Sequence, residues 1–505
     1  MKHFYLFVLL LISSITYSQI TLLKDINASP YPFGQESYNS SPDKLFAFNG
    51  KFYFAADDSQ ATNTGGIDAG KELWVSDGTP EGTVLLKDLD GSAESSNPTY
   101  FFELNNKLYF NAAIPGADTY SVYTTDGTEA GTVIITDDFR TGEIAVIIGN
   151  KAYMRNFNAD YTGSFYEFDG TTFTELPDNG TGTVKVTSDY IGFNNNSILF
   201  SMTYDDGGTG TSVGNELYLY DITNQTYTLV KDVNDAGDSS LNHMTKLGDN
   251  VYFEYDNDLW VTDGTSAGTT VVTSATSINS LKSLYAWEGK LYFEGDDGGF
   301  DQLWVYDPVA DTISDLSGYT EDNPNGFTFN HDPVHFAAPG DGYLYYAGKS
   351  VGTFATYRLY RTNGVSIEPI EIDLFDNVDE IIVLNNKLYF EASNNTLNTD
   401  YTAGTVDIGR ELFTYTNDEL NTLSTTTFDL DNSFSVYPNP STDLFNIKTT
   451  LTGSVNYTLY NVLGTKVLSG TVENDIINHN LQSGMYLLKL DNGSVSTTKK
   501  VIIKK

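Results

Sequence analysis

Hydrophobic and polar positions alternate along most of the chain, in short runs that end at Gly, Asn or Asp. One recurrent run is a hairpin. Alternating apolar residues are followed by a turn pair such as Asn-Gly or Asn-Asn, then usually by a lysine, and then by a second strand rich in aromatic residues. Asn-Gly between two alternating strands predicts a tight hairpin, because both turn residues tolerate positive φ. Clear copies are FAFNGKFYF (46–54), FELNNKLYF (102–110), TKLGDNVYF (245–253), YAWEGKLYF (285–293) and IVLNNKLYF (382–390), with weaker copies around Tyr153, Leu199 and Tyr345.

A second strand-turn-strand element follows each hairpin, with Asp-Gly at its turn. Three copies are close matches: ELWVSDGTPEGTV (72–84), SVYTTDGTEAGTV (121–133) and DLWVTDGTSAGTT (258–270). Degenerate copies cover 165–173, 216–228, 302–313, 358–367 and 411–420. Alignment places an aromatic residue at one strand position, every 42 to 56 residues: Trp74, Tyr123, Tyr166, Tyr218, Trp260, Trp304, Tyr360 and Phe413.

Two hairpins per repeat predict a four-stranded unit, and such units at intervals of about 40 to 50 residues are typical of propeller blades. The predicted fold class is therefore all-β, a β-propeller with eight four-stranded blades followed by a small C-terminal β-sandwich. Seven blades with one repeat displaced is the alternative, because the third and seventh copies are weak. One sheet cannot cover both its faces, so we expect the aromatic column to pack between blades rather than to stack on sugars.

The start of the repeat region carries a spare strand. ITLLKDIN (20–27) resembles VLLKDLDG (84–91) and TLVKDVND (228–235), which both end a repeat. We expect it to pair with the final repeat near residues 410–416 and to close the ring. The final repeat's own fourth strand, Asn421 to Thr427, is poor in apolar residues, which fits this replacement.

The repeats resemble the ELWxxDGT repeat of exported bacterial proteins over about residues 20–425, on the strength of the three closest copies. The resemblance implies an exported, propeller-like repeat protein. It implies no reaction and no catalytic residues.

The segment after Asp431 changes to short alternating strands, which predict a small β-sandwich. It resembles the type A C-terminal sorting domain of the type IX secretion system of Bacteroidetes. The matching residues are Tyr-Pro-Asn-Pro (437–440), Leu-Tyr-Asn (459–461) with Gly464, Ser-Gly-Met-Tyr-Leu (483–487), and the basic end at Lys499, Lys500, Lys504 and Lys505. The resemblance implies the type IX secretion machinery as a partner, passage across the outer membrane, and release or attachment at the cell surface.

The N-terminus carries a targeting pattern. Lys2 and His3 precede an apolar run from Phe4 to Ile15, and small and polar residues follow as far as Gln19. A run of about 12 apolar residues is too short to span a membrane and suits a signal peptide. The chain thus divides into a signal peptide (1–18), a repeat domain (19–428), a linker (429–433) and a sorting domain (434–505), with no transmembrane segment in the mature chain.

Charge and composition exclude some classes of binding partner and some kinds of site. The net charge is −40, whereas residues 433–505 hold seven lysines against four acidic residues, which supports a boundary near 430. An acidic body repels phosphate backbones, so we expect no nucleic-acid partner. The chain has no cysteine, which excludes disulfides, thiolate metal sites and lipid attachment through an N-terminal cysteine.

Catalytic motifs are weak. Gly-Thr-Ser-Val-Gly (210–214) fits the pattern around a hydrolase nucleophile, but no helix follows Ser212, as that motif requires. The five histidines, His3, His243, His331, His335 and His479, are read as solvated loop residues rather than as a zinc site. We assign no catalytic and no cofactor-binding residue.

Acidic residues in several loops are candidates for structural calcium sites. Calcium prefers several carboxylate and carbonyl oxygens from such loops. The candidates are Asp57 with Asp58, Asp205 with Asp206, Asp296 with Asp297, and Asp232 with Asp235 and Asp238. None has the EF-hand spacing, and a solvated acidic surface is the alternative.

These observations predict a secreted or surface-attached propeller that binds a glycan, polymer or protein without catalysing a reaction. Its ligand would contact loops that differ between repeats, the longest of which are 55–71, 201–215 and 391–410. The alternative is a secreted polysaccharide or peptide hydrolase with acidic residues in the channel, and a third reading is a surface-layer component. A hydrolase should show buried carboxylates of raised pKa converging in the channel, and a binder an exposed aromatic and polar patch.

Overall fold

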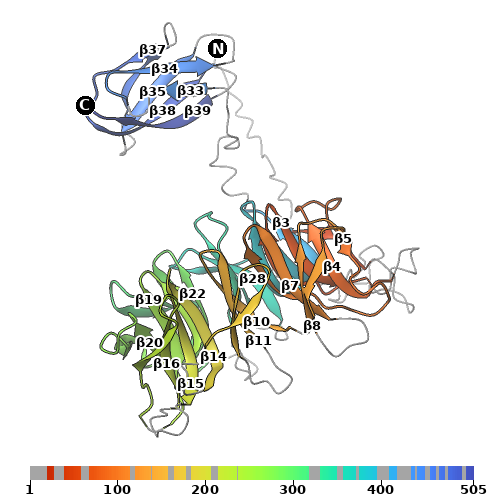
Figure 1. Ribbon diagram of the computed structural model, residues 1–505. Coiled ribbons are helices and arrows are strands. Elements are labelled where there is room, and N and C mark those ends of the chain that lie inside the picture. The colour runs from red at the N-terminus through yellow and green to blue at the C-terminus, as the bar shows by residue number, and fades with distance from the viewer. Residues whose placement is uncertain are drawn as a thin grey trace, which may run out of the picture. The chain divides into compact units, whose positions relative to one another are not determined.

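The computed structural model forms two compact units, one within Met1–Asn417 and the other within Asp418–Lys505 (Figure 1). The structure describes residues 20–27, 39–58, 68–113, 120–137, 139–156, 164–177, 183–205, 214–235, 237–317, 330–349, 356–370, 375–394, 409–417, 434–437, 441–449, 455–461, 466–472, 476–491 and 496–505. Within them, no helix has the length and hydropathy needed to cross a membrane.

The described part of the first unit contains eight four-stranded antiparallel sheets. Seven follow chain order: β2–β5 (Asp43–Phe48, Lys51–Asp57, Lys71–Ser76, Val84–Lys87), β6–β9 (Thr99–Leu104, Lys107–Ala113, Tyr120–Thr125, Val133–Thr136), β10–β13 (Thr141–Ile148, Lys151–Asn156, Phe165–Phe168, Phe173–Glu175), β14–β17 (Thr183–Asn194, Ser197–Asp205, Asn215–Asp221, Thr226–Lys231), β18–β21 (Asn242–Leu247, Asn250–Tyr255, Asp258–Thr262, Thr270–Val271), β22–β25 (Asn279–Trp287, Lys290–Asp296, Gln302–Asp307, Thr312–Asp315) and β26–β29 (Val334–Ala337, Leu344–Lys349, Tyr357–Thr362, Ile367–Pro369). The eighth joins β30–β32 (Phe375–Leu384, Lys387–Asn394, Arg410–Tyr415) to β1 (Ile20–Lys24), and a 3₁₀ turn, η2 (Thr273–Ala275), follows β21.

The sheets form a closed cycle. The first strand of each sheet contacts the first strand of the next, from β2 through β6, β10, β14, β18, β22 and β26 to β30, and β30 contacts β2. The first strands are therefore the innermost strands. This arrangement is β-propeller-like, as the repeats predict.

The first described strand completes the last sheet, as the sequence predicts. β1 runs antiparallel to β32, with Ile20 opposite Tyr415 and Leu22 opposite Phe413. Leu22 thereby takes the place that Leu85 has opposite Trp74 in the first sheet. Residues 421–427, which would otherwise supply a fourth strand, lie outside the described residues.

The aromatic column holds one register throughout. Each member lies on the third strand opposite the same position of the second strand, as with Trp74 opposite Phe54 and Phe413 opposite Phe390. Six members are buried, whereas Tyr166 and Trp260 are half-buried. None of the eight is exposed, which confirms that the column packs inside the protein rather than on its surface.

The three closest Asp-Gly-Thr turns repeat one hydrogen-bond network. In the first, the Asp77 carboxylate accepts from the Thr79 amide (2.9 Å) and hydroxyl (2.7 Å), and the Thr83 hydroxyl donates to the Thr79 carbonyl (2.7 Å). The same distances recur at Asp126 and at Asp263. Side chains of Asp and Thr thus satisfy the backbone groups that a tight turn leaves unpaired.

The glycine of this turn joins neighbouring sheets. Gly127 has φ +87°, and a Cβ there would lie 2.6 Å from the hydroxyl of Tyr53, which belongs to the preceding sheet. A Cβ on Gly78 would clash in the same way with the hydroxyl of Tyr389 across the ring closure. The aromatic hairpin and the Asp-Gly turn therefore recur together because a tyrosine of one sheet needs a glycine of the next.

The second unit has two antiparallel sheets among its described residues. One orders β33 (Phe434–Tyr437), β34 (Leu444–Thr449) and β37 (Ile476–Asn478), and the other orders β36 (Lys466–Thr471), β35 (Asn456–Asn461), β38 (Gly484–Asp491) and β39 (Ser496–Ile503). Phe445 and Ile447 from the first sheet form one buried cluster with Leu459, Leu488 and Val501 from the second. Short alternating strands thus give this unit a core of its own.

Candidate functional site

The inner strands carry a bulge at a recurrent position. In β2 the pairing with β3 shifts between Asp43 and Phe46, and comparable shifts occur in β6, β18, β22, β26 and β30. At these bulges a residue other than glycine has φ between 48° and 58°: Lys44, Tyr100, His243, Ser283, His335 and Glu380. Positive φ strains such a residue, and a bulge changes the direction of its side chain, so both features suggest a functional position.

The side chains at these bulges differ from repeat to repeat. Equivalent positions hold a lysine, a phenol, two imidazoles, a hydroxyl and a carboxylate. We name these six residues the bulge ring. The backbone is repeated but the chemistry is not, which is expected of a surface that recognises one asymmetric ligand.

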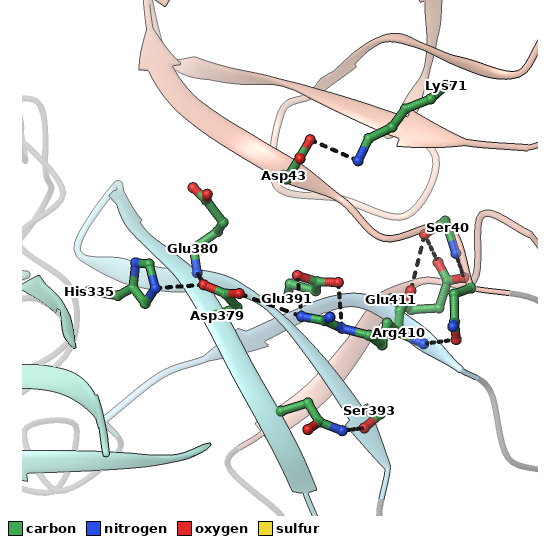
Figure 2. A network of polar contacts seen from close by, with 12 residues as sticks. Ser40, Asp43, Lys71, His335, Asp379, Glu380, Glu391, Ser393, Arg410 and Glu411 are labelled. Carbon is green, nitrogen blue, oxygen red and sulfur yellow. Dashed lines mark hydrogen bonds and ion pairs between the residues drawn. The ribbon is translucent and has the colours of Figure 1, made fainter. Parts of the chain in front are cut away.

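The most connected part of the bulge ring lies at the ring closure, where Figure 2 shows a chain of polar contacts. His335 Nε2 on β26 lies 2.6 Å from Asp379 Oδ1 on β30. Arg410 on β32 lies 3.5 Å from Asp379 and forms a two-point ion pair with Glu391 of β31, at 2.8 and 2.9 Å. Four strands, β26, β30, β31 and β32, thus contribute to one network of alternating charge.

These contacts shift the pKa of each acid and base. Burial works against charge on Asp379, but its hydrogen bond and ion pair with His335, aided by Arg410, hold its pKa below the usual range. Burial also opposes protonation of His335, but Asp379 and Glu380 raise its pKa. Burial raises the pKa of Glu391 to about 8 against the opposing charge of Arg410. The side chains of His335 and Asp379 stay 37% and 40% exposed, so solvent reaches them.

A cavity of about 340 Å³ adjoins the network. It is lined by bulge-ring residues Lys44, Tyr100 and Glu380 and by the rings of Phe46 and Phe101. Lys44 and Glu380 form an ion pair of 3.4 Å between β2 and β30, and Phe46 stacks on Phe101 at 6.3 Å. A second cavity of about 610 Å³ shares both phenylalanines. Aromatic faces beside charged groups suit a polar ligand with flat apolar faces.

Buried carboxylates of raised pKa occur elsewhere, but each has protein partners. Burial raises the pKa of Glu72 to about 7 and of Glu411 to about 8. Glu72 accepts from the amides of Leu89 (2.8 Å) and Ser96 (2.6 Å). Glu411 accepts in the same way from Ile26 and Ser40. These side chains fix the loops that link consecutive sheets.

These glutamates are absent from the acidic positions that the sequence pattern marks as candidates. Glu72, Glu216 and Glu411 each stand two residues before an aromatic of the column, in segments that begin Glu-Leu-aromatic. Their recurrence beside Lys-Asp-apolar segments was the available signal. The bulge ring carries no such signal, because no residue type is common to its members.

The expectation of solvated histidines is wrong for two of them. His331 is buried, with Nε2 3.0 Å from the Tyr346 hydroxyl and Nδ1 2.8 Å from the Lys349 carbonyl, and burial lowers its pKa to about 4. His479 is buried in the second unit, where Nε2 lies 2.9 Å from the Ser441 hydroxyl. His243 and His335 are exposed, whereas His3 lies outside the described residues. Aromatic-rich sheets supply polar partners that allow a neutral imidazole to be buried.

Several of the positions that the sequence marks as candidates lie outside the described residues, in whole or in part. Ser212 and Asp206 lie outside the described residues, as do 59–67, 206–213 and 395–408 of the three longest loops. Asp58 is buried and accepts from the Ala69 amide (3.0 Å), and Asp296 accepts from Gly298 (2.7 Å), so both hold their own loops. Glu294, Asp301 and Asp332 come together, but Lys282 and Lys349 already form ion pairs with Glu294 and Asp332.

Comparisons with solved structures return weak likenesses. A prolyl endopeptidase gives a TM-score of 0.45 with 13% identity over 72% of this chain and 55% of that one, and prolyl oligopeptidase B from Galerina marginata gives 0.43 with 11% over 72% and 57%. The β-propeller domain of the Trilobed protease from Pyrococcus furiosus gives 0.40 with 11% over 66% and 98%. The chain spans little more than half the length of the two peptidases.

Comparisons of sequence inform on the C-terminal unit. A search of curated proteins finds no match to this chain. Residues 435–504 match the model of the secretion system C-terminal sorting domain, over the segment that sequence analysis assigns to sorting. This segment is a type IX secretion sorting domain, and the protein is exported from the cell, to its surface or to the extracellular space.

Proposed function

We propose that the mature protein is a non-catalytic binding or adhesion module, an eight-bladed propeller of ELWxxDGT repeats that acts outside the cell. In this proposal residues 1–18 are a signal peptide of a Bacteroidetes protein, 19–428 form the propeller, 429–433 are a linker and 434–505 form a type A sorting β-sandwich. The ligand is a glycan, another polymer or a protein, held at the inner end of the blades.

The bulge ring is the observation that carries this proposal. Six inner strands hold a strained residue at equivalent positions, and five different side-chain types occur among the six. Strain of this kind costs about 1 to 3 kcal/mol per residue and persists where a constraint maintains it. Tyr100 and Lys44 line a cavity with two phenylalanines, which is the aromatic and polar patch expected of a binder.

The buried carboxylates support binding over hydrolysis. A hydrolase of the predicted kind would hold an acid of raised pKa facing the channel. Instead, Glu72 and Glu411 accept hydrogen bonds from loop amides, and Glu391 forms an ion pair with Arg410. The alternative is a polysaccharide or peptide hydrolase, and the binding experiment must distinguish it from a binder that causes no turnover.

A retention screen with turnover monitored in the same samples tests the proposal. The full mature chain would be passed over immobilised polysaccharides and surface proteins while released sugars and peptides are measured. We expect retention on one polymer without turnover, and a loss of more than tenfold in affinity for Lys44→Ala combined with Tyr100→Ala. Tyr437→Ala, an exposed tyrosine of the second unit, is the matched control and should bind normally. Turnover that the double variant abolishes would replace this proposal with the hydrolase.

A further inference from the structure

Three loops between sheets hold equivalent groups of oxygen ligands. Each group combines a buried glutamate of the third strand with an Asp-x-Asp or Asp-x-Asn segment that leaves a fourth strand. We name them the crossover clusters, and their members are Glu72, Asp88 and Asp90; Glu216, Asp232 and Asn234; and Glu411, Asp25 and Asn27.

The hydrogen bonds show that the clusters are equivalent. The amide between the two Asx residues donates to the glutamate in every case, from Leu89 at 2.8 Å, Val233 at 2.6 Å and Ile26 at 2.9 Å. A serine further along each loop donates its hydroxyl to the same glutamate. In all three places, therefore, the fold bonds the glutamate to the backbone between the two Asp or Asn residues.

The first cluster concentrates negative charge. One carboxylate oxygen each from Glu72, Asp88 and Asp90 lies within 4.8 Å of the others. In the described part of the chain, no ion pair to lysine, arginine or histidine involves any carboxylate of the three clusters. The group of Glu294, Asp301 and Asp332 differs, because two lysines already neutralise it.

The other two clusters contain buried oxygens that have no hydrogen-bond partner. Glu216 has no exposed surface, yet its Oε1 is unpaired, and so is Oδ1 of Asp232. In the third cluster Asn27 is 1% exposed, and its Oδ1 and that of Asp25 are unpaired. A buried oxygen without a donor is rare and costs about 1 to 3 kcal/mol, so four of them in equivalent clusters point to a missing electropositive partner.

The ligand set indicates which partner. All the side-chain atoms available as metal ligands are carboxylate or amide oxygens, which suit a hard cation. Zinc would favour histidine or cysteine. Calcium accepts such oxygens in irregular loops, and Asp-x-Asp or Asp-x-Asn is a spacing that its sites use. We propose that each crossover cluster binds one Ca²⁺ ion.

Calcium at the third cluster would act on ring closure. Glu411 lies on the last sheet, whereas Asp25 and Asn27 follow the first strand of the chain, and the Ile26 to Glu411 hydrogen bond joins residues 385 apart. An ion held between them would tie the two ends of the ring together. Extracellular modules bind calcium with dissociation constants of about 10⁻⁴ to 10⁻³ M, so the clusters would fill outside the cell.

Calorimetric titration of the EDTA-treated full chain with CaCl₂ tests the proposal, together with thermal unfolding. We expect about three Ca²⁺ per chain and a higher melting temperature in millimolar CaCl₂ than in EDTA. Asp232→Asn and Asp25→Asn should each lower the stoichiometry by about one, because they remove a charge from different clusters. Asp249→Asn, at an exposed acidic residue of a hairpin turn outside every calcium candidate, should leave both readouts unchanged.

Two results would overturn it. One is a full chain that takes up less than one Ca²⁺ at millimolar concentration while its melting temperature is the same in EDTA and CaCl₂. The other is uptake that Asp232→Asn and Asp25→Asn leave as in the parent chain, which would place the ions elsewhere. Because these are single isosteric changes, circular dichroism should show both variants folded, and terbium luminescence gives a second measure of occupancy in the same samples.

Discussion

The Asp-Gly-Thr turns and the bulge ring are two backbone features that recur around the same cycle of sheets, yet they treat sequence differently. The turns at Asp77, Asp126 and Asp263 keep the same residues and the same distances. The bulges at Lys44, Tyr100 and the equivalent positions keep the backbone strain but change the side chain. The turn geometry depends on particular side-chain atoms, so the same residues recur there. The bulge geometry does not depend on the side chain, so residues at the bulges can vary and can contact a ligand.

The largest expected effect is at a turn glycine. Gly127→Val should destabilise the fold by about 3 kcal/mol, because valine disfavours φ +87° and its Cβ would lie 2.6 Å from the Tyr53 hydroxyl. Gly50→Val is the control, since Gly50 has φ +73° but no neighbour within 4 Å, and strain alone should cost about 1 to 2 kcal/mol. Chemical denaturation of both variants measures the difference, and equal losses would contradict the role of the tyrosine contact.

A buried hydroxyl of the turn should have the next largest effect. Thr132→Val removes the donor to the Thr128 carbonyl and the partner of the Thr125 hydroxyl, both at 2.7 Å. We expect a loss of about 1 to 2 kcal/mol, since a buried polar group is left unpaired. Thr226→Val, at an exposed strand position, should change stability by less than about 0.5 kcal/mol. Denaturant midpoints compare the two, and a neutral Thr132 variant would argue against the turn network as a stabilising element.

The bulge ring should respond more weakly, and in a pH-dependent way. Because the pKa of His335 is raised in the folded protein, its ion pair with Asp379 stabilises the fold below about pH 6.5. This contribution is lost as the pH rises through the folded-state pKa. The lowered pKa of Asp379 makes the same pair stabilising above about pH 3.8, and the contribution is lost as pH falls further. His335→Gln should therefore cost up to about 1 kcal/mol between these limits and almost nothing at pH 9.

Stability curves of the His335→Gln variant and the parent chain from pH 3 to 9 check this window. Lys44, Glu380 and Arg410 surround the pair, so the Lys44→Ala chain serves as a background in which the window should shift but persist. A difference independent of pH would show that packing, not charge, accounts for the effect of the histidine.

The smallest expected effect has the opposite sign. His243→Gly should leave stability unchanged or raise it by up to about 1 kcal/mol, because glycine relieves the strain of φ 57° at an exposed position. Thermal unfolding measures it, with exposed Thr226→Gly as a strand control that should be destabilised. A marked loss at His243 would mean that the bulge residues support the fold rather than a ligand.

Sequence patterning predicted much of the fold and little of the site. Period-two alternation and Asn-Gly turns located the hairpins, and the resemblance of residues 20–27 to two repeat ends located the closing strand. These signals succeed because they depend on neighbouring residues. The ion pair of His335 with Asp379 and the bulge ring arise between sheets, from residues that share no motif. Burial of His331 depended on a tyrosine and a carbonyl that only the folded sheet places beside it.

The pairing of β1 with β32 sets an order of events for a newly made chain. Strand β1 is synthesised before the other described strands of the ring, whereas its partner β32 ends at Tyr415, so the last sheet stays incomplete until residue 415 has been added. Bringing segments about 390 residues apart together costs about 5 kcal/mol in chain entropy, which neighbouring sheets must already offset. The ring should therefore assemble sheet by sheet and lock last, and until then the exposed edge of β32 is the place where a chaperone or a misfolded neighbour would bind.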